Sequence, residues 1–216
     1  MHQHPLFAGV FVPAALLLAN SAAAEALHAA PLAASAQTPA PARAVVRFWR
    51  EAGPDRWFAK DPAFDTRFRE RFAAEHAAAA RGELASWMET ADGALGLIIL
   101  LDQYPRNAFR GTPRMYETDA LARTYADQAV ARGLDQQVAP PMRLFVFLPF
   151  GHSEDPRDQA RSVMLAGQLG EPSLSHAKGH HAIIMRFGRF PHRNPILGRA
   201  STAEELSYLA AGGFPG

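Results

Sequence analysis

Helix start and stop signals recur from residue 43 to the end of the chain, and they constrain the fold more than any other feature. Asp61 is an N-cap residue, and Pro62 follows it at the first helical position. Phenylalanine then recurs every four residues, at Phe64, Phe68 and Phe72, as on one face of a helix. No segment shows the sustained alternation of a strand, and no Asn-Gly hairpin signal occurs. The pattern therefore predicts helices throughout.

The predicted helices are about ten to twenty residues long and are joined by short loops, which is typical of an all-α, irregular array of antiparallel helices. Residues 90–104 form the most apolar helix, which we expect to be central and to stop at Pro105. A capping box from Ser201 to Glu204 opens the last helix. The predicted helices span residues 44–52, 62–81, 90–104, 118–132, 140–151, 155–169, 172–187 and 202–211.

Composition bounds the function. The chain has 216 residues and a net charge of +1, so a general nucleic-acid-binding surface is not predicted. It contains no cysteine, which excludes thiol nucleophiles, disulfides and Cys-ligated zinc. The length suits one domain, predicted to span residues 43–216.

The N-terminal residues 1–42 are predicted to be a signal peptide followed by a flexible linker rich in Ala and Pro. No Lys or Arg occurs before Arg43, and an apolar run at residues 6–18 precedes Ser21 and three alanines. The uncharged N-terminus and Pro13 leave a misassigned start or an unstructured extension as alternatives. If this segment is a signal peptide, the protein is expected to be periplasmic or secreted. Otherwise it is expected to be cytoplasmic. No stable membrane anchor is expected, because the run is shorter than the roughly 20 residues that span a bilayer.

The segment at residues 186–199 carries a dense set of hydrogen-bond donors around a turning backbone. No Asp or Glu lies between Glu171 and Glu204, although the whole chain is nearly neutral. Such a local excess of positive charge requires acidic partners from elsewhere in the fold or an anionic ligand. Its arginines are Arg186, Arg189, Arg193 and Arg199.

Polar residues cluster at the ends of three predicted helices, at residues 101–110, 148–155 and 186–199. We call these the first, second and third cassette, and Gln159 lies one turn beyond the second. The third cassette lacks acids, so we expect the three to converge in space. The acids Asp102, Glu154 and Asp155 would then face Arg189, Arg193 or Arg199. The guanidinium fork of arginine can donate two parallel hydrogen bonds to one carboxylate.

Four blocks of the sequence closely resemble the motifs of a bacterial family named only as domain of unknown function 924. The resemblance covers residues 45–209 and implies an all-α fold related to tetratricopeptide-like helical arrays. It implies no activity, cofactor or substrate. The blocks are WFAKDPAFD, LDQYPRNAFRGTPRMY, FLPFGHSEDPRDQ and RFGRFPHRNPILGRASTAEE.

The resemblance also assigns family motif positions, and it has departures. Ala182 stands where the family usually has an acidic residue two positions after the motif histidine, and the N-terminal extension is atypical of a family that looks cytosolic. The matching positions are Asp102, Gln103, Arg106, Asn107, Arg110, His152, Ser153, Glu154, Gln159, His180, Arg189, His192, Arg193, Asn194 and Arg199.

These observations predict a polar, arginine-rich pocket that binds a small anionic molecule or a peptide terminus. An enzyme of the hydrolase or transferase type is the alternative, with His152, Glu154 or His192 as the catalytic candidates. The predicted ligand-binding residues are Asp102, Gln103, Arg106, Asn107, Arg110, His152, Glu154, Gln159, Arg189, His192, Arg193, Asn194 and Arg199.

Each candidate also has a structural interpretation. His152 and Glu154 stand at a helix entrance and could cap it, and the arginines could tie helix ends together through buried ion pairs. A metal at His152 and Glu154 would need Asp102 and His192 as further ligands, and no metal or cofactor is predicted. His176 and His180 are four residues apart on a helix, a spacing that suits a pair of metal ligands. The same spacing also occurs on solvated basic helix faces.

Overall fold

The computed structural model describes residues 37–216, which form one unit. Its regular elements are α-helices and 3-10 helices, and these residues contain no β-strand, so the predicted all-α fold class is confirmed. The α-helices are α2 (Ala40–Ala52), α3 (Pro54–Trp57), α4 (Pro62–Ala80), α5 (Ala91–Ala108), α6 (Asp119–Ala131), α7 (Pro140–Gly151), α8 (Pro156–Gly167), α9 (Ser173–Phe187) and α10 (Ala203–Ala210). The 3-10 helices are η1 (Ala85–Glu89), η2 (Pro113–Tyr116), η3 (Asp135–Gln137) and η4 (Pro191–Arg193).

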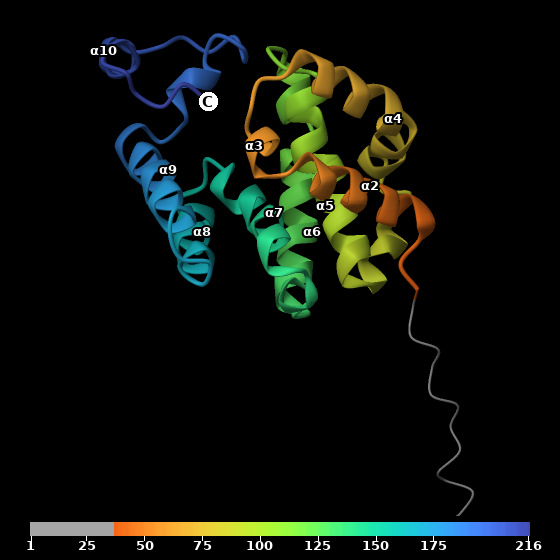
Figure 1. Cartoon of the computed structure of the whole chain (residues 1–216). Coiled ribbons are helices and arrows are strands. Elements are labelled where there is room, and N and C mark those ends of the chain that lie inside the picture. The colour runs from red at the N-terminus through yellow and green to blue at the C-terminus, as the bar shows by residue number, and fades with distance from the viewer. Residues whose placement is uncertain (1–36) are drawn as a thin grey trace, which may run out of the picture. The chain divides into compact units, whose positions relative to one another are not determined.

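Helix α5 is the centre of the array and contacts α2, α4, α6 and α7 (Figure 1). It begins after Thr90, whose hydroxyl accepts a hydrogen bond from the Gly93 amide. The apolar residues 97–101 are all fully buried, so the helix is covered on every side there. The prediction that this helix is central is therefore confirmed.

An aromatic layer joins α2 and α4. Phe68 lies within 5.2 Å of the Phe48 ring and 5.3 Å of the Trp49 ring, measured between centroids. Phe64 and Phe72 continue the predicted stripe along α4 and are also buried. Such ring pairs contribute beyond the area that they bury, so the phenylalanine stripe positions α4 on α2.

The predicted linker extends too far. Helix α2 begins at Ala40, and Ala42 is fully buried within it, although the sequence placed both in the flexible linker. A Cβ on Gly96 of α5 would lie 3.1 Å from the Ala42 carbonyl oxygen, so this glycine allows the two helices to approach closely. A composition rich in small residues is typical of a flexible linker, but it also allows helices to pack closely. Composition alone therefore did not distinguish the two at Ala40 and Ala42.

The prediction that α5 stops at Pro105 is wrong, because the helix continues to Ala108. A proline inside a helix leaves the carbonyl four residues earlier without its amide donor, which here is that of Leu101. The hydroxyl of Thr118 donates a hydrogen bond to this carbonyl instead. Helix α5 therefore extends one turn further and carries Arg106 and Asn107 on helical backbone.

The capping box of the last helix is shifted by one residue from the predicted position. Thr202, not Ser201, is the N-cap, and its hydroxyl accepts a hydrogen bond from the Glu205 amide. The Glu205 carboxylate, rather than that of Glu204, accepts a hydrogen bond from the Thr202 amide. Both registers satisfy the sequence pattern, because a hydroxyl residue precedes a glutamate by three positions in each.

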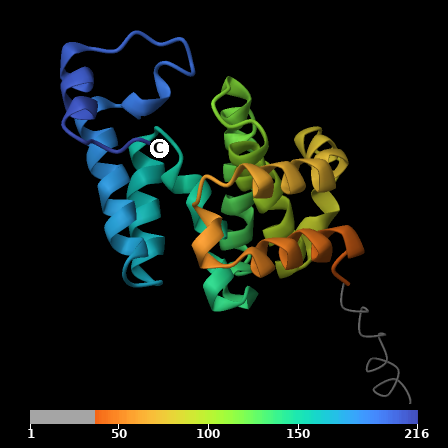
Figure 2. The ribbon, with the colours of Figure 1, turned by 45° about the horizontal axis from the view of Figure 1, so that its top comes forward.

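Consecutive helices pack on one another through the rest of the chain. Helix α6 contacts α7, α7 contacts α8, and α8 lies against α9 (Figures 1 and 2). The chain after α9 turns through η4 into α10 at the end of these helices (Figure 2). This order is that of the predicted array, and the relation to tetratricopeptide-like folds remains a prediction.

Residues 1–36, and with them the predicted signal peptide and most of the linker, lie outside the described residues. Among residues 37–216, no helix combines the length and the apolar character that crossing a membrane requires.

The first testable prediction concerns Pro105. Replacing Thr118 with Val should lower the free energy of unfolding by about 1–3 kcal/mol, because it leaves the buried Leu101 carbonyl without a donor. Urea denaturation measures the change. In a Pro105→Ala background the amide at position 105 can supply the bond, so the cost of Thr118→Val should largely disappear. If Thr118→Val lowers the free energy of unfolding equally in both backgrounds, the Thr118 hydroxyl does not replace the missing amide of Pro105.

Thr124→Val is the matched control, because the Thr124 hydroxyl also donates to a backbone carbonyl, that of Ala120 in its own helix, but is exposed to solvent. We expect it to change the free energy of unfolding by less than about 0.5 kcal/mol.

Candidate functional site

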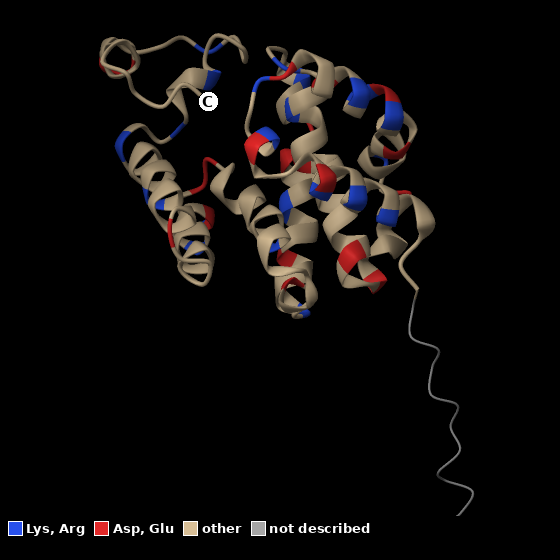
Figure 3. Ribbon diagram, in the orientation of Figure 1, with Lys and Arg blue, Asp and Glu red and all other residues tan. Residues whose placement is uncertain are grey.

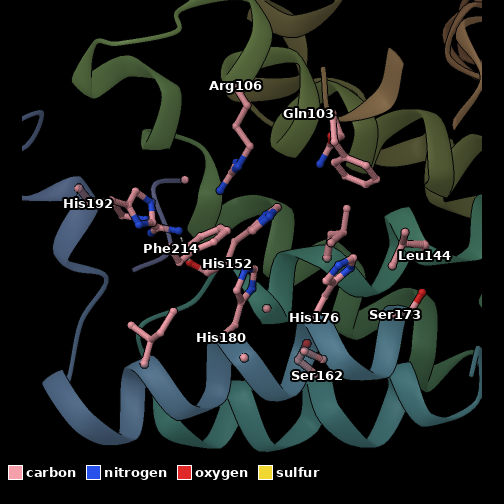
Figure 4. A pocket seen from close by; sticks show the side chains of 18 of the residues that line it. Gln103, Arg106, Leu144, His152, Ser162, Ser173, His176, His180, His192 and Phe214 are labelled. Carbon is pink, nitrogen blue, oxygen red and sulfur yellow. Dashed lines mark hydrogen bonds between the residues drawn. The ribbon is translucent and has the colours of Figure 1, made fainter. Parts of the chain in front are cut away.

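A cavity of about 800 Å³ lies where α5 and α7 face α8, α9 and the residues after α9. This volume is within the range of about 300–1,000 Å³ that ligand pockets occupy. Figure 4 shows Arg106 and Gln103 projecting from one side, and His176 and His180 from the opposite side. The cavity therefore lies between segments that are distant in sequence.

The lining is basic and aromatic. No Asp or Glu of the described residues lines this cavity. The segment after α9 carries Lys or Arg without an acid until α10, as Figure 3 shows. The basic and histidine lining residues are Lys60, Arg106, Arg110, His152, His176, His180, Arg186, His192 and Arg193.

The three cassettes meet beside this cavity. Nδ1 of His152 lies 2.7 Å from Oδ1 of Asp102, which joins the second cassette to the first. Arg193 donates a hydrogen bond to the His152 carbonyl, which joins the third cassette to the second. Arg199 binds Glu154 with both ends of its fork, at 2.7 and 3.0 Å. The convergence expected from the acid-free third cassette is therefore present.

Asp102 is the buried acid of this site. Its side chain is fully buried, and Gln103 donates a hydrogen bond to Oδ2 while Oδ1 faces His152 and Arg106. Burial alone would raise the pKa of the carboxyl. The charges of Arg106 and His152 and the hydrogen bonds outweigh burial and hold the pKa of Asp102 below its usual value. The group is therefore a carboxylate at neutral pH.

Three of the histidines that line the cavity, His152, His180 and His192, are neutral near pH 7. Burial lowers the pKa of His180 to about 4, and burial together with Arg193 lowers the pKa of His192 to about 4. Burial and the nearby Arg106 also lower the pKa of His152, although Asp102 acts in the opposite direction. These rings offer lone pairs and flat faces at neutral pH rather than charge.

Arg193 is the most buried cation of the lining. It is 7% exposed, its guanidinium lies 4.6 Å from the Tyr116 ring centroid, and the Asp119 carboxylate is 3.8 Å away. Burial and Arg106 lower the pKa of Arg193. Its Nε, and the Nδ1 of neighbouring His192, have no hydrogen-bond partner among residues 37–216. The buried charge is thus incompletely compensated within this part of the protein.

The predicted ligand-binding residues fall into two groups. Those that line the cavity are Gln103, Arg106, Asn107, Arg110, His152, His192 and Arg193. Those that make contacts elsewhere in the fold are Asp102, Glu154, Gln159, Arg189, Asn194 and Arg199.

Three of the expected acid–arginine pairings are wrong. Asp102 pairs with Arg106 of its own helix and with His152, not with an arginine of the third cassette. Arg189 does not meet a cassette acid: it binds Glu205 of α10 with both ends of its fork. Asp155 faces no cassette arginine either, because it caps α8 and pairs with Arg157. Glu205 also accepts from Asn194, so α10 supplies the acid that fixes the start of the third cassette.

Three residues beside the candidate site were not identified from the sequence. Asp119 binds Arg106 with both carboxylate oxygens, at 2.8 and 3.0 Å, and Tyr116 stacks on Arg193. An acid in the first turn of a helix is expected for the helix dipole alone, so Asp119 gave no separate signal. Tyr116 does lie in a family block, and Phe214 lies near the chain end with no motif around it.

His152 and Glu154 do not act on one target. His152 turns to Asp102, whereas Glu154 accepts the Phe190 amide and holds Arg199. Among residues 37–216 no group of three His, Cys, Asp or Glu side chains is arranged to bind a metal. Glu154 therefore belongs to the connection between cassettes, and His152 to the cavity wall.

Comparisons with known proteins agree with the motif resemblance. A family described as "Bacterial protein of unknown function (DUF924)" matches residues 45–213. The chain belongs to this family. A solved structure, that of the protein of unknown function ATU0120 from Agrobacterium tumefaciens, is 53% identical and superposes with a TM-score of 0.80. The match covers 82% of this chain and 100% of that one, and no curated protein matches.

The second testable prediction follows from the neutral histidines. His180 has a pKa of about 4 in the folded protein against an ordinary value of 6.5, so the unfolded chain binds the proton first as the pH falls. The stabilisation is complete above pH 6.5 and is lost down to about pH 4. Between pH 7 and pH 5 we expect the free energy of unfolding to fall by about 2 kcal/mol on this account.

Urea denaturation at the two pH values measures this loss. His180→Gln should reduce the loss, whereas His181→Gln, outside the cavity wall, should retain it. An identical loss in wild type and His180→Gln would contradict the prediction.

Proposed function

We propose that this protein binds a small anionic molecule in the cavity, with Arg193 as the principal charged contact. The observation that carries the proposal is the lining itself, which combines several cations with no carboxylate. Because the cavity walls have a low dielectric constant, that excess positive charge acts more strongly on an anion there than on the surface.

The hydrogen-bonding state of the arginines supports a division of roles. Arg106 already pairs with Asp119 and donates to the Asp102 carbonyl, and Arg110 is held by Asp65. Arg193 keeps an unpaired Nε, and no ion pair involves Lys60 among the described residues. Lys60 and Arg193 are therefore the lining cations with the weakest internal pairing and can take a carboxylate or a phosphate, whereas the other arginines build the wall.

The cavity also accommodates an apolar part of the ligand. Leu144, Phe147 and Leu148 of α7 face it, and Ile183 of α9 lies opposite. Ligand sites are usually apolar with a few polar groups that fix orientation, as here. A molecule with one anionic end and an apolar body therefore suits this cavity better than a free inorganic ion.

The third testable prediction is that inorganic phosphate and N-acetyl-alanine bind to the full chain and perturb the His152 and His192 ring resonances in NMR titrations. Arg193→Met should weaken both affinities about tenfold, because one hydrogen bond to a charged group contributes about 1.5 kcal/mol. Arg193→Lys keeps the charge and loses the fork, so its affinity should lie between the two.

Arg157→Met is the matched control, since this arginine is solvent-exposed on α8 and does not line the cavity. Should Arg193→Met fail to fold, Lys60→Met provides the same comparison at an exposed position. Equal affinities in Arg193→Met, Lys60→Met and Arg157→Met would overturn the proposal.

A second candidate function is catalysis with His152 as general base, and the Asp102–His152 hydrogen bond favours it. Donation from Nδ1 to a carboxylate leaves Nε2 as the basic nitrogen and fixes the ring orientation. His192 lies on the same cavity wall but is neutral near pH 7, so it could act there only as a second base, and Arg193 would stabilise developing negative charge. Glu154 is excluded from this role by its pair with Arg199.

The fourth testable prediction distinguishes this candidate. If His152 is a general base, the protein should hydrolyse p-nitrophenyl acetate or p-nitrophenyl phosphate above the buffer rate, and His152→Gln should reduce turnover at least about 100-fold. His181→Gln should leave turnover unchanged. Hydrolysis that persists in His152→Gln would assign the reaction to another group, and no hydrolysis would leave anion binding as the function.

A further inference from the structure

We propose that the slot between His180 and His192, which Phe214 fills in this structure, is an aromatic subsite of the cavity. The bound anion carries an aromatic ring, and this ring replaces the Phe214 side chain. The inference rests on the proposed function, because it names the class of anion that the same cavity takes. It also makes residues 214–216 an internal competitor of the ligand.

Three rings form the slot. The Phe214 centroid lies 4.8 Å from that of His180 and 5.1 Å from that of His192. Phe190 is 1% exposed and closes the floor, at 5.4 Å from His180 and 5.6 Å from His192. The side chains of Phe214, His180 and His192 lie side by side in Figure 4. All four distances fall within the 4.5–7 Å typical of aromatic pairs.

The walls of the slot suit an uncharged planar group. Both histidines are neutral near pH 7, since burial lowers each pKa to about 4. A neutral imidazole stacks without the desolvation cost of a charge. Arg193 lines the same cavity, and its guanidinium lies 4.5 Å from the centroid of the Phe190 ring, so a cation stands beside the slot for an anionic group attached to the ring.

The present occupant is weakly held. Among the described residues, one hydrogen bond joins residues 214–216 to the rest of the protein, from the Phe214 amide to the Tyr208 hydroxyl. Phe214 itself is 36% exposed, although it fills the slot. Gly212 and Gly213 precede it, and Gly212 has a φ of 82°, a conformation that favours glycine. The segment can therefore leave the slot without disturbing the helices.

Occupancy by the protein's own phenylalanine is itself informative. A side chain that enters a preformed slot reports the shape and chemistry that the slot accepts. Residues 214–216 also lie against the wall, since a Cβ on Gly216 would be 2.7 Å from the His192 ring. A peptide-like segment with an aromatic side chain thus already fits this part of the cavity.

The test compares two probes with the same carboxylate, N-acetyl-phenylalanine and N-acetyl-alanine, by NMR titration of the full chain. In Phe214→Ala, N-acetyl-phenylalanine should bind about three- to tenfold more tightly than in wild type, because it no longer competes with the internal ring. The affinity for N-acetyl-alanine should stay within twofold. The His180 and His192 ring resonances should shift on Phe214→Ala and return toward the wild-type positions when N-acetyl-phenylalanine binds.

Leu206→Ala is the matched control, because Leu206 is an exposed apolar residue of α10 outside the cavity wall. It should bind both probes as wild type does. Equal gains for the two probes in Phe214→Ala, or no gain for N-acetyl-phenylalanine, would overturn the aromatic subsite.

Failure of this inference is distinct from failure of the proposed function. If phosphate and N-acetyl-alanine bind in an Arg193-dependent manner while the aromatic probe gains nothing, the cavity binds anions and the slot has no role in selecting them. If neither anion binds to wild type or to Phe214→Ala, the proposed function falls and the subsite falls with it.

Discussion

The buried carboxylate of Asp102 is the constraint on which the rest of the site depends. A fully buried charge costs several kcal/mol unless it is paired and hydrogen-bonded, and Asp102 obtains its partners from two helices. Gln103 and Arg106 come from its own helix, and His152 comes from the end of α7. The need to satisfy this one group therefore joins α5 to α7 and sets the orientation of the His152 ring.

The array itself explains why the polar cassettes gather at one place. The C-terminal ends of α5, α7 and α9 meet there, through the bonds of His152 to Asp102 and of Glu154 to the Phe190 amide. The intervening helices α6 and α8 return the chain, as short connections between neighbouring helices require. Carbonyl groups at helix ends lack internal donors, so this meeting point also needs donors such as Arg193.

The sequence was sufficient where one physical requirement dominated. The apolar face of α5 and the phenylalanine stripe of α4 predicted the core, and the acid-free third cassette predicted that other segments must approach it. It was insufficient where chemically equal choices competed. Glu154 and Glu205 are both glutamates within reach, and only the register of the Thr202 cap places Glu205 on Arg189. The extension of α5 past Pro105 likewise depends on a distant hydroxyl.

The same competition explains how the cavity remains positively charged. The carboxylates near it are paired with other cations. Asp119 holds Arg106 and Asp65 holds Arg110 in the wall, and Glu154 turns away to Arg199 outside it. Compensating Arg193 fully would need another acid, and none of the described acids lines the cavity. Under the proposed function, an anion that enters would offset part of the desolvation cost that the fold has already met at Arg193. The incomplete pairing of this buried arginine would then contribute to the binding energy.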